Sequence, residues 1–226
     1  MDTLTDMKLS DKTIKLLKNF SSINQSILFK EGSKLRTISV MKNILAEATV
    51  DEEFPKDFGI YDLVQFLNGL DLHETPELDF TRDEHVVIRE GKMRSKYFFA
   101  DPSVIVSPPD KPLSLPTQDV CFILRSQQLE KLKKASYVYS LPDISAIGED
   151  GVVKLVARDK KNDTSNDFSI VVGETDKTFC AYYKTENFKM IQDDYDVAIS
   201  SQKISHFINR NKPIQYWVAI EPDSEF

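Results

Sequence analysis

Three carboxylates stand close together late in the chain, at Asp193, Asp194 and Asp196. Carboxylate oxygens are the ligands that Mg²⁺ prefers, and a metal held in this way supports phosphoryl transfer. A metal-dependent nuclease, or another phosphoryl-transfer enzyme acting on nucleic acid, is therefore one hypothesis. The competing interpretation is a solvated acidic turn ahead of a strand. Aspartates are common in such turns, so we favour the turn.

The remaining candidates for catalysis are few. His73, His85 and His206 are far apart and belong to no metal-binding motif, and none of the seven glycines forms a phosphate-cradling loop. Cys121 and Cys180 each lie inside an apolar run, which predicts reduced core thiols. No nucleophile is paired with a base in the local sequence. The sequence thus predicts no catalytic residue, no metal, no cofactor and no enzymatic activity.

A lysine-rich face is the first positive signal. Residues 8–20 have helical spacing, with Leu9, Ile14, Leu16, Leu17 and Phe20 on one arc. The other arc carries four lysines and a single acid, Asp11, near the first turn. A surface helix usually mixes both signs of charge, because Glu–Lys pairs stabilise it. The lysines of this arc are Lys8, Lys12, Lys15 and Lys18.

A second helix, predicted over residues 126–139, has the same character. Its buried side includes Leu129 and Leu132, and its other side carries Lys131, Lys133 and Lys134. When this helix is shifted back by 115 residues along the sequence, Leu129 aligns with Ile14 and Lys133 aligns with Lys18. One lysine-bearing helix near the start of each half indicates contact with a polyanion, and lysines without base-reading partners indicate contact with phosphate. The alternative is that both faces are merely solvated surface.

The charge distribution favours a positive site on a negative body. The chain has 226 residues, 41% hydrophobic residues and a net charge of −7. Residues 8–36 hold seven basic and two acidic residues, a sum of +5, whereas residues 51–101 hold six basic and thirteen acidic residues, a sum of −7. Contact with nucleic acid would then be confined to the basic faces. No apolar run is long enough to span a membrane, and no signal peptide is seen.

The rest of the chain predicts an α+β fold with antiparallel sheets covered on one side by helices. Short period-two runs alternate with two further helical stretches, 60–70 and 185–192. Five prolines between Pro102 and Pro116 indicate an extended connector. Each half then has the order helix, strands, short helix, strands, which suggests internal duplication. We predict domains at 1–104 and 118–226, joined by a connector at 105–117. The expected strands are 26–30, 35–40, 44–50, 78–80, 86–89, 93–99, 120–124, 143–147, 152–158, 168–173, 179–183, 195–200, 205–209 and 215–220.

The chain resembles the sliding clamps, or DNA polymerase processivity factors, of T-even-type bacteriophages. The resemblance covers nearly the whole length and is weakest in the middle of the second half. The first six residues look like an extension, which leaves Met7 as an alternative start to Met1. The matching pieces are Lys8-Leu-Ser, Leu16-Leu-Lys-Asn-Phe20, Ile23-Asn24, Ile60-Tyr-Asp-Leu63, Phe66-Leu67, Ala100-Asp-Pro-Ser103, Lys111-Pro112 and Tyr216-Trp-Val-Ala-Ile-Glu221 with the final Phe226.

This resemblance implies a homotrimer that closes head to tail around duplex DNA, with helices lining the hole and sheets outside. The seven lysines named above would face the DNA without reading its sequence. The implied partners are the phage DNA polymerase, an ATP-driven clamp loader and, as an open question, transcription proteins, all in the cytoplasm of the infected bacterial host. A pocket beside the connector and the last strand would take partner peptides, on Trp217, Val218, Ala219 and Ile220. The alternative is that Trp217 belongs to the core of the sheet. A structural phage protein without a DNA role is the remaining alternative.

Overall fold

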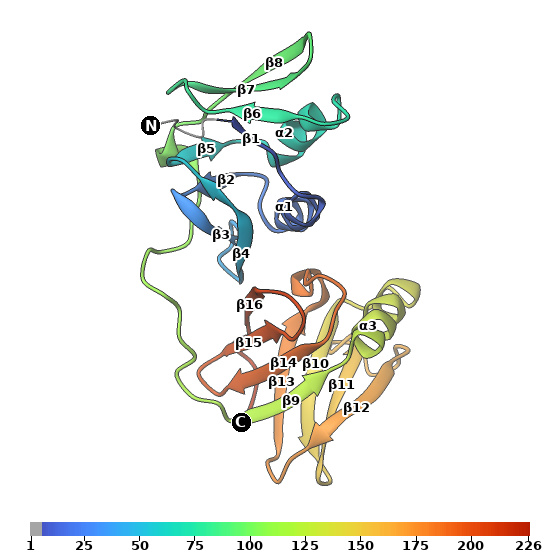
Figure 1. Cartoon of the computed structure of the whole chain (residues 1–226). Helices are drawn as coiled ribbons and strands as arrows, with labels where there is room; N and C mark the ends of the chain where they lie inside the picture. Colours follow the sequence, from blue (N-terminus) through green and yellow to red (C-terminus); the bar gives the residue numbers. More distant parts are fainter. Residues whose placement is uncertain (1–5) are drawn as a thin grey trace. The chain divides into compact units, whose positions relative to one another are not determined.

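The computed structural model describes residues 6–226 and divides into two compact units, Met1–Asp110 and Lys111–Phe226 (Figure 1). Most of the expected extension lies outside the described residues, so the choice between Met1 and Met7 stays a prediction. The division falls inside the predicted connector. Its expected limits, 105–117, also stay a prediction.

The first unit contains two helices and two small antiparallel sheets, together with a hairpin (Figure 1). One sheet has the order β1-β6-β7-β8, the second pairs β2 with β5, and β3 pairs with β4. The elements are β1 (Asp6–Met7), α1 (Asp11–Ile23), β2 (Ile27–Phe29), β3 (Gly32–Ile38), β4 (Ile44–Phe54), β5 (Phe58–Ile60), α2 (Leu63–Leu70), β6 (Glu77–Asp79), β7 (His85–Glu90), β8 (Met93–Phe98) and the 3₁₀ turn Pro102–Val104.

The start of α1 is fixed by a half-buried carboxylate. The hydroxyl of Ser10 caps the helix by accepting from the backbone N–H of Thr13 at 3.3 Å. Glu52, on β4, accepts from the backbone N–H of Ser10 and from the hydroxyl of Thr13, both at 2.5 Å. Burial raises the pKa of Glu52, but these hydrogen bonds outweigh it and lower the pKa overall. The helix therefore begins at Asp11 and is tied to β4.

The core of the first unit is rich in aromatic rings. The rings of Phe29 and Phe58 stack with centroids 4.5 Å apart, and Phe54, Phe80 and Phe99 surround them. Such pairs add directional stabilisation to the burial of apolar area. The stacked pair sits on β2 and β5. These two strands precede and follow the β3–β4 hairpin in the chain, and they share one core.

The first part of the connector is attached to the first unit. Ile105 is buried, and Asn24 donates from Nδ2 to the carbonyls of Ile38 at 2.8 Å and Val106 at 3.1 Å. Arg36 donates to the carbonyl of Pro109 at 2.8 Å. A Cβ on Gly59 would come within 2.6 Å of Ile105 Cδ1, so this close approach requires glycine. Residues 105–109, the first part of the proline-rich segment, are therefore held on the first unit by the side chains of Asn24 and Arg36.

The second unit has one α-helix and two four-stranded antiparallel arrays (Figure 1). One array has the order β12-β11-β10-β13, and in the other β16, β15, β14 and β9 pair in that order. The elements are β9 (Val120–Leu124), α3 (Ser126–Val138), β10 (Asp143–Glu149), β11 (Val152–Arg158), β12 (Phe168–Glu174), β13 (Phe179–Lys184), the 3₁₀ turn Thr185–Asn187, β14 (Tyr195–Ser200), β15 (Ile204–Asn209) and β16 (Ile214–Ala219).

The helix expected over residues 185–192 is wrong, because only the 3₁₀ turn Thr185–Asn187 forms. The backbone beyond it is bound by tertiary partners. The N–H of Ile191 donates to the hydroxyl of buried Tyr216 at 3.3 Å, and its carbonyl accepts from Tyr195 at 2.7 Å. The two hydroxyls therefore satisfy the backbone N–H and carbonyl of Ile191, which would otherwise form hydrogen bonds within a helix. The two halves consequently do not share a second helix.

The other elements follow the sequence closely, and the α+β class with antiparallel sheets is confirmed. Several boundaries differ, and β5 was not expected. The helix expected from Ile60 begins at Leu63, because Ile60 completes β5 and Asp62 caps the helix by accepting from the N–H of Gln65 at 2.8 Å. Within residues 6–226, no helix has the length and apolar character needed to cross a membrane.

Candidate nucleic-acid interface and partner site

The first lysine-bearing face lies on α1, whose apolar side packs against α2, β3 and β4 (Figure 1). Lys12, Lys15 and Lys18 are exposed on the opposite side. Lys12 Nζ lies 3.9 Å from Asp51 and Lys18 Nζ lies 3.4 Å from Asp71. In the described part of the chain, Lys15 has no ion pair. Exposed ion pairs are weak in water, so these lysines can exchange a carboxylate for a phosphate.

Lys8 does not belong to this helical face. It precedes the cap residue Ser10, and its Nζ lies 3.2 Å from Glu77 on β6. The predicted start of the helix was too early, because the cap provided by Ser10 and Glu52 was not recognised. A contact between Lys8 and DNA stays a prediction with less geometric support.

Asp194 fixes the start of the second lysine-bearing helix, α3. One carboxylate oxygen accepts from the N–H of Ser126 at 2.7 Å, and the other accepts from Arg125 at 2.9 Å. The N–H of Ser126 and then Arg125 lower the pKa of Asp194. Gln128 accepts from the N–H of Arg125 at 2.9 Å. A negative charge here also complements the positive end of the helix dipole.

Two of the three lysines on α3 are free to meet an external anion. Lys131 and Lys134 are exposed, and neither has an ion pair within residues 6–226. Lys133 is different: its Nζ donates to the carbonyl of Met190 at 3.1 Å, and burial lowers its pKa. Lys133 is therefore bound to its own unit and is a poorer candidate for DNA contact.

The three late carboxylates do not form one metal site. Asp193 accepts from Asn211 at 2.5 Å and from Lys212, Asp194 caps α3, and Asp196 lies 3.0 Å from Arg210. Burial would raise the pKa of Asp193, but hydrogen bonds from Lys212 and Asn211 outweigh it and bring the pKa to about 2. No group of potential metal ligands occurs in the described part of the chain. The nuclease hypothesis required these three carboxylates to bind one metal ion together, and the structure does not bring them together for that purpose.

The predicted peptide pocket on the last strand is only partly exposed. Val218 and Ile220 are buried in the core, at 0% and 4% exposure, so they do not line an open pocket. Trp217 lies on the other face of the sheet, where its ring stacks on His206 with centroids 4.5 Å apart. Trp217 is itself only 5% exposed, so among these four residues half-buried Ala219 is the more open one on that face.

A hollow of about 300 Å³ lies on the face of β9, β14 and β15 that also carries His206. Its apolar wall includes Ile123, Ala198 and Ile208, and Asp196 contributes a carboxylate. Cys121 also lines it and is exposed, so the prediction of a core thiol is wrong for this residue. The alternation in Val120–Leu124 contained this information, because Val120, Phe122 and Leu124 are buried, so Cys121 and Ile123 point to the other face.

Two family models match the chain. The model "DNA polymerase processivity factor" matches residues 8–107, and the model "gp45 sliding clamp, C terminal" matches residues 121–222. The chain belongs to the gp45-type sliding clamp family.

The similar proteins agree with this assignment over the full length. The sliding clamp of Vibrio phage KVP40 is 33% identical, covering 95% of this chain and 99% of its own, and that of Enterobacteria phage T4 is 29% identical, covering 96% and 98%. The proliferating cellular nuclear antigen of Entamoeba histolytica has a TM-score of 0.68 at 16% identity, covering 92% and 94%. That of Thermococcus kodakaraensis has a TM-score of 0.67 at 14% identity, covering 96% and 99%. These structures show the DNA clamp fold.

Membership in this family also decides the class of function. The clamp is a processivity factor of DNA replication and does not catalyse a reaction. Glu52 and Asp194 fix the starts of the two lysine-bearing helices. Sequence reasoning missed both roles: Glu52 was not considered, and Asp194 was considered as a metal ligand or as part of a solvated turn, not as a helix cap.

Proposed function

We propose that three copies of this clamp close head to tail around duplex DNA and hold the phage DNA polymerase at its template. The observation that carries the proposal is one lysine-bearing helix in each unit of a chain whose net charge is −7. Lys15, Lys131 and Lys134 are the exposed and unpaired lysines of these helices within residues 6–226. Lys12 and Lys18 add charge that is partly compensated by Asp51 and Asp71.

This arrangement suits sliding better than tight binding. Lysine ammonium groups are compact charges on flexible stems, and phosphates recur uniformly along the duplex. Each contact can therefore pass to the next phosphate at little cost. A closed ring needs no strong attraction, because its topology keeps it on the DNA. A polymerase attached to the ring then has a high effective concentration at the primer end.

Two open sheet edges of opposite charge support closure into a ring. In the first unit, β8 is the last strand of β1-β6-β7-β8, and Lys92, Arg94 and Lys96 are exposed along it. In the second unit, β12 is the last strand of its array and is flanked by exposed Asp167 and Glu174. Unpaired strand edges readily pair with another chain.

The same edges carry apolar side chains for such a contact. Met93 and Phe98 of β8 are 53% and 63% exposed, and Val171 of β12 is 53% exposed. Because each copy would contribute one basic and one acidic edge, the contact is heterologous and can propagate from copy to copy until it closes. We assign β8 of one copy and β12 of the next to this contact.

The apolar hollow beside His206 is the proposed docking site for partner peptides. Its outward-facing apolar residues continue toward Trp217 through the His206–Trp217 stack. The phage polymerase and the ATP-driven loader that opens the ring are the expected users, and transcription proteins are a further candidate. These steps would take place in the cytoplasm of the infected host.

Molecular mass and shape in solution test the ring. Light scattering and small-angle X-ray scattering at micromolar concentration should give three times the chain mass of 25.9 kDa and a profile with a central hole. A stable monomer under these conditions, or a compact particle without a hole, would contradict the proposal.

A further inference from the structure

Exposed apolar side chains lie near the end of α3, the second lysine-bearing helix. Tyr137 is 86% exposed and Val138 is 60% exposed, although both belong to the helix. The opposite side of α3 packs on β11 and β12, so these two side chains are not needed for the core. Contiguous exposed apolar side chains mark sites of contact with another molecule. The end of α3 is therefore a candidate for such a contact.

Tyr137 continues the line of lysines along α3. Residues three or four positions apart are neighbours on the surface of a helix. Lys131, Lys134 and Tyr137 follow one another at this spacing, and Val138 comes four positions after Lys134. Glu130, the only acid in the sequence of this helix, lies one turn before Lys134. This face therefore combines an open aromatic ring with two cations on one side of the helix.

The matching face of α1 has lysines but no aromatic ring. The sequence shift that aligns Lys133 with Lys18 also aligns Tyr137 with Ser22, and Ser22 is exposed. Contact with phosphate alone thus needs no ring in α1. An aromatic side chain among lysines has a second capacity, because bases stack on aromatic rings while cations follow the phosphates. The two helices then differ in what they can bind: α1 offers charge, whereas α3 offers charge and a stacking surface.

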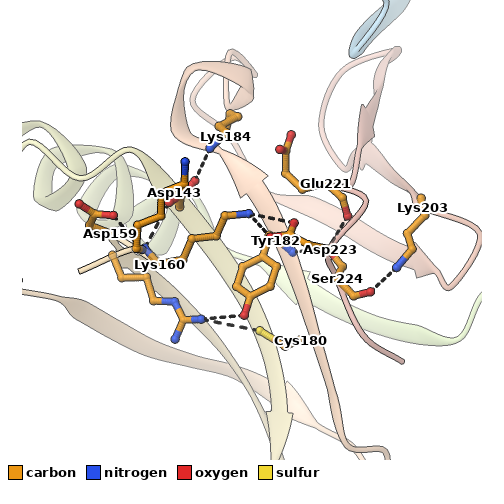
Figure 2. Close-up of polar contacts among 12 residues, drawn as sticks. Asp143, Asp159, Lys160, Cys180, Tyr182, Lys184, Lys203, Glu221, Asp223 and Ser224 are labelled. Atoms are coloured by element: carbon orange, nitrogen blue, oxygen red, sulfur yellow. Dashed lines mark hydrogen bonds and ion pairs between the residues drawn. The ribbon is translucent and has the colours of Figure 1, made fainter. Parts of the chain in front are cut away.

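The cation and ring near the carboxyl terminus of the chain are not available in the same way. Lys160 donates from Nζ to both carboxylate oxygens of Asp223, at 2.7 and 2.9 Å, and lies 4.5 Å from the ring centre of Tyr182 (Figure 2). An incoming phosphate would have to displace a carboxylate that is already in place. Lys131 and Lys134 have no ion pair within residues 6–226, so α3 can accept an anion in this unit at a lower cost.

We propose that the exposed face of α3 binds single-stranded DNA, with the ring of Tyr137 stacked on an unpaired base and with Lys131 and Lys134 on neighbouring phosphates. The bases of a duplex are stacked inside it, so the unpaired template beyond the primer end is the strand that can offer a base to the ring. Because every base has a flat aromatic face, the contact tolerates any sequence. The inference rests on the proposed function for the presence of DNA at α3, and it adds a distinction between the unpaired template and the duplex.

Oligothymidylate is the probe for this contact. A fluorescein-labelled strand of about twelve nucleotides, a length that one binding site can cover, is titrated at low salt and followed by fluorescence anisotropy. Tyr137→Ser, which gives α3 the residue found in α1, should bind at least about fivefold more weakly, because one stacked base is lost. Tyr137→Phe keeps the ring and should bind as the unaltered chain does. A strand of the same length without bases should bind the unaltered chain as weakly as oligothymidylate binds Tyr137→Ser.

Tyr139→Ser is the matched control, because Tyr139 is exposed at the end of the same helix but lies off the line of lysines. It should bind oligothymidylate as the unaltered chain does, and circular dichroism melts check that each variant is folded. Tyr137→Ser should keep its affinity for duplex DNA and its mass in solution.

Several results would overturn the proposal. They are unchanged binding of oligothymidylate to folded Tyr137→Ser, equal loss in Tyr137→Phe and Tyr137→Ser, and equal weakening of duplex and single strand. A fall in mass would also overturn it, because Tyr137 would then belong to a contact between copies. A monomeric unaltered chain contradicts the proposed ring instead, and the comparison of Tyr137→Ser with Tyr139→Ser on the single strand still decides this inference.

Discussion

At the residue scale, Asp194 connects the acidic turn to the lysine-bearing helix. It accepts from the N–H of Ser126 and from Arg125, so it serves as the N-terminal cap that Arg125, at the cap position, does not itself provide. We expect Asp194→Ala to lower the melting temperature and to weaken clamp-dependent DNA synthesis through a less ordered α3.

Asp194→Asn distinguishes capping from charge. Asparagine keeps an acceptor for Ser126 but loses the negative charge, so it should recover most of the melting temperature. Circular dichroism melts of both variants provide the measurement. Equal loss in the two variants would show that the charge, rather than the cap, is what stabilises this end of the helix.

Asp193 should govern part of the stability at acid pH. Its pKa is about 2 in the folded chain, against an ordinary value of 3.8. A depressed carboxyl pKa stabilises the fold fully above the ordinary value, and this contribution is lost as the pH falls toward the folded value. Asp193→Asn should therefore be less stable than the unaltered chain at pH 6, and the difference should shrink between about pH 4 and pH 2.

Urea unfolding at a series of pH values measures this difference. Lys212→Met removes a principal donor to Asp193 and should reduce the acid-dependent stability in the same pH range. A constant difference between the unaltered chain and Asp193→Asn at all pH values would contradict the assigned pKa.

At the element scale, the strands were predicted from the sequence more accurately than the segment 185–192, where a helix was expected and an irregular backbone is found. Val120–Leu124 and Val152–Arg158 form strands with the predicted bounds, because apolar alternation reports the buried face directly. The segment 185–192 has helical spacing, yet the hydroxyls of Tyr195 and Tyr216 bind its backbone. The Tyr216 hydroxyl comes from β16, 25 residues beyond Ile191, and no local pattern reveals such a partner. The same reason explains why Glu52 was missed as the anchor of α1.

The lysine faces of α1 and α3 lead to the next prediction. Lys15→Glu/Lys131→Glu/Lys134→Glu reverses the exposed, unpaired charges and should reduce clamp-dependent product length strongly while leaving the melting temperature nearly unchanged. Each lysine that contacts a phosphate contributes about 0.9 to the slope of log affinity against log salt, so the variant should also show a shallower salt dependence of DNA binding.

Lys42→Glu is the matched control, because Lys42 is exposed on the β3–β4 turn and lies outside both helices. It reverses the charge of one lysine without altering either face and should leave product length unchanged. Unaltered processivity in the triple variant would remove α1 and α3 from the proposed interface.

At the scale of the whole molecule, the two-unit organisation and the family could be predicted from the sequence, whereas the subunit contact could not. The proline run lies where the chain divides, and the motifs around Lys8 and Tyr216 resemble the family that the comparisons confirm. The contact depends on which strands end a sheet. The order β1-β6-β7-β8 places Met93–Phe98 at an edge, and strand order is a non-local property that the pattern of a single strand does not contain.

The charge difference between the β8 and β12 edges predicts how the ring responds to exchange of charge. Arg94→Glu/Lys96→Glu gives β8 the same sign as β12 and should shift the assembly from trimer to monomer at micromolar concentration, because like charges facing each other oppose pairing. Asp167→Lys/Glu174→Lys should do the same from the other side. Combining all four changes restores opposite charges with their positions exchanged, so the combined variant should recover the trimer. High salt should weaken the unaltered ring and partly relieve the two separate variants.

Light scattering at two salt concentrations measures all four chains. Recovery in the combined variant would establish that β8 and β12 meet, because no change confined to one edge can compensate for a contact made elsewhere. If both separate variants remain trimeric, the contact lies on other elements.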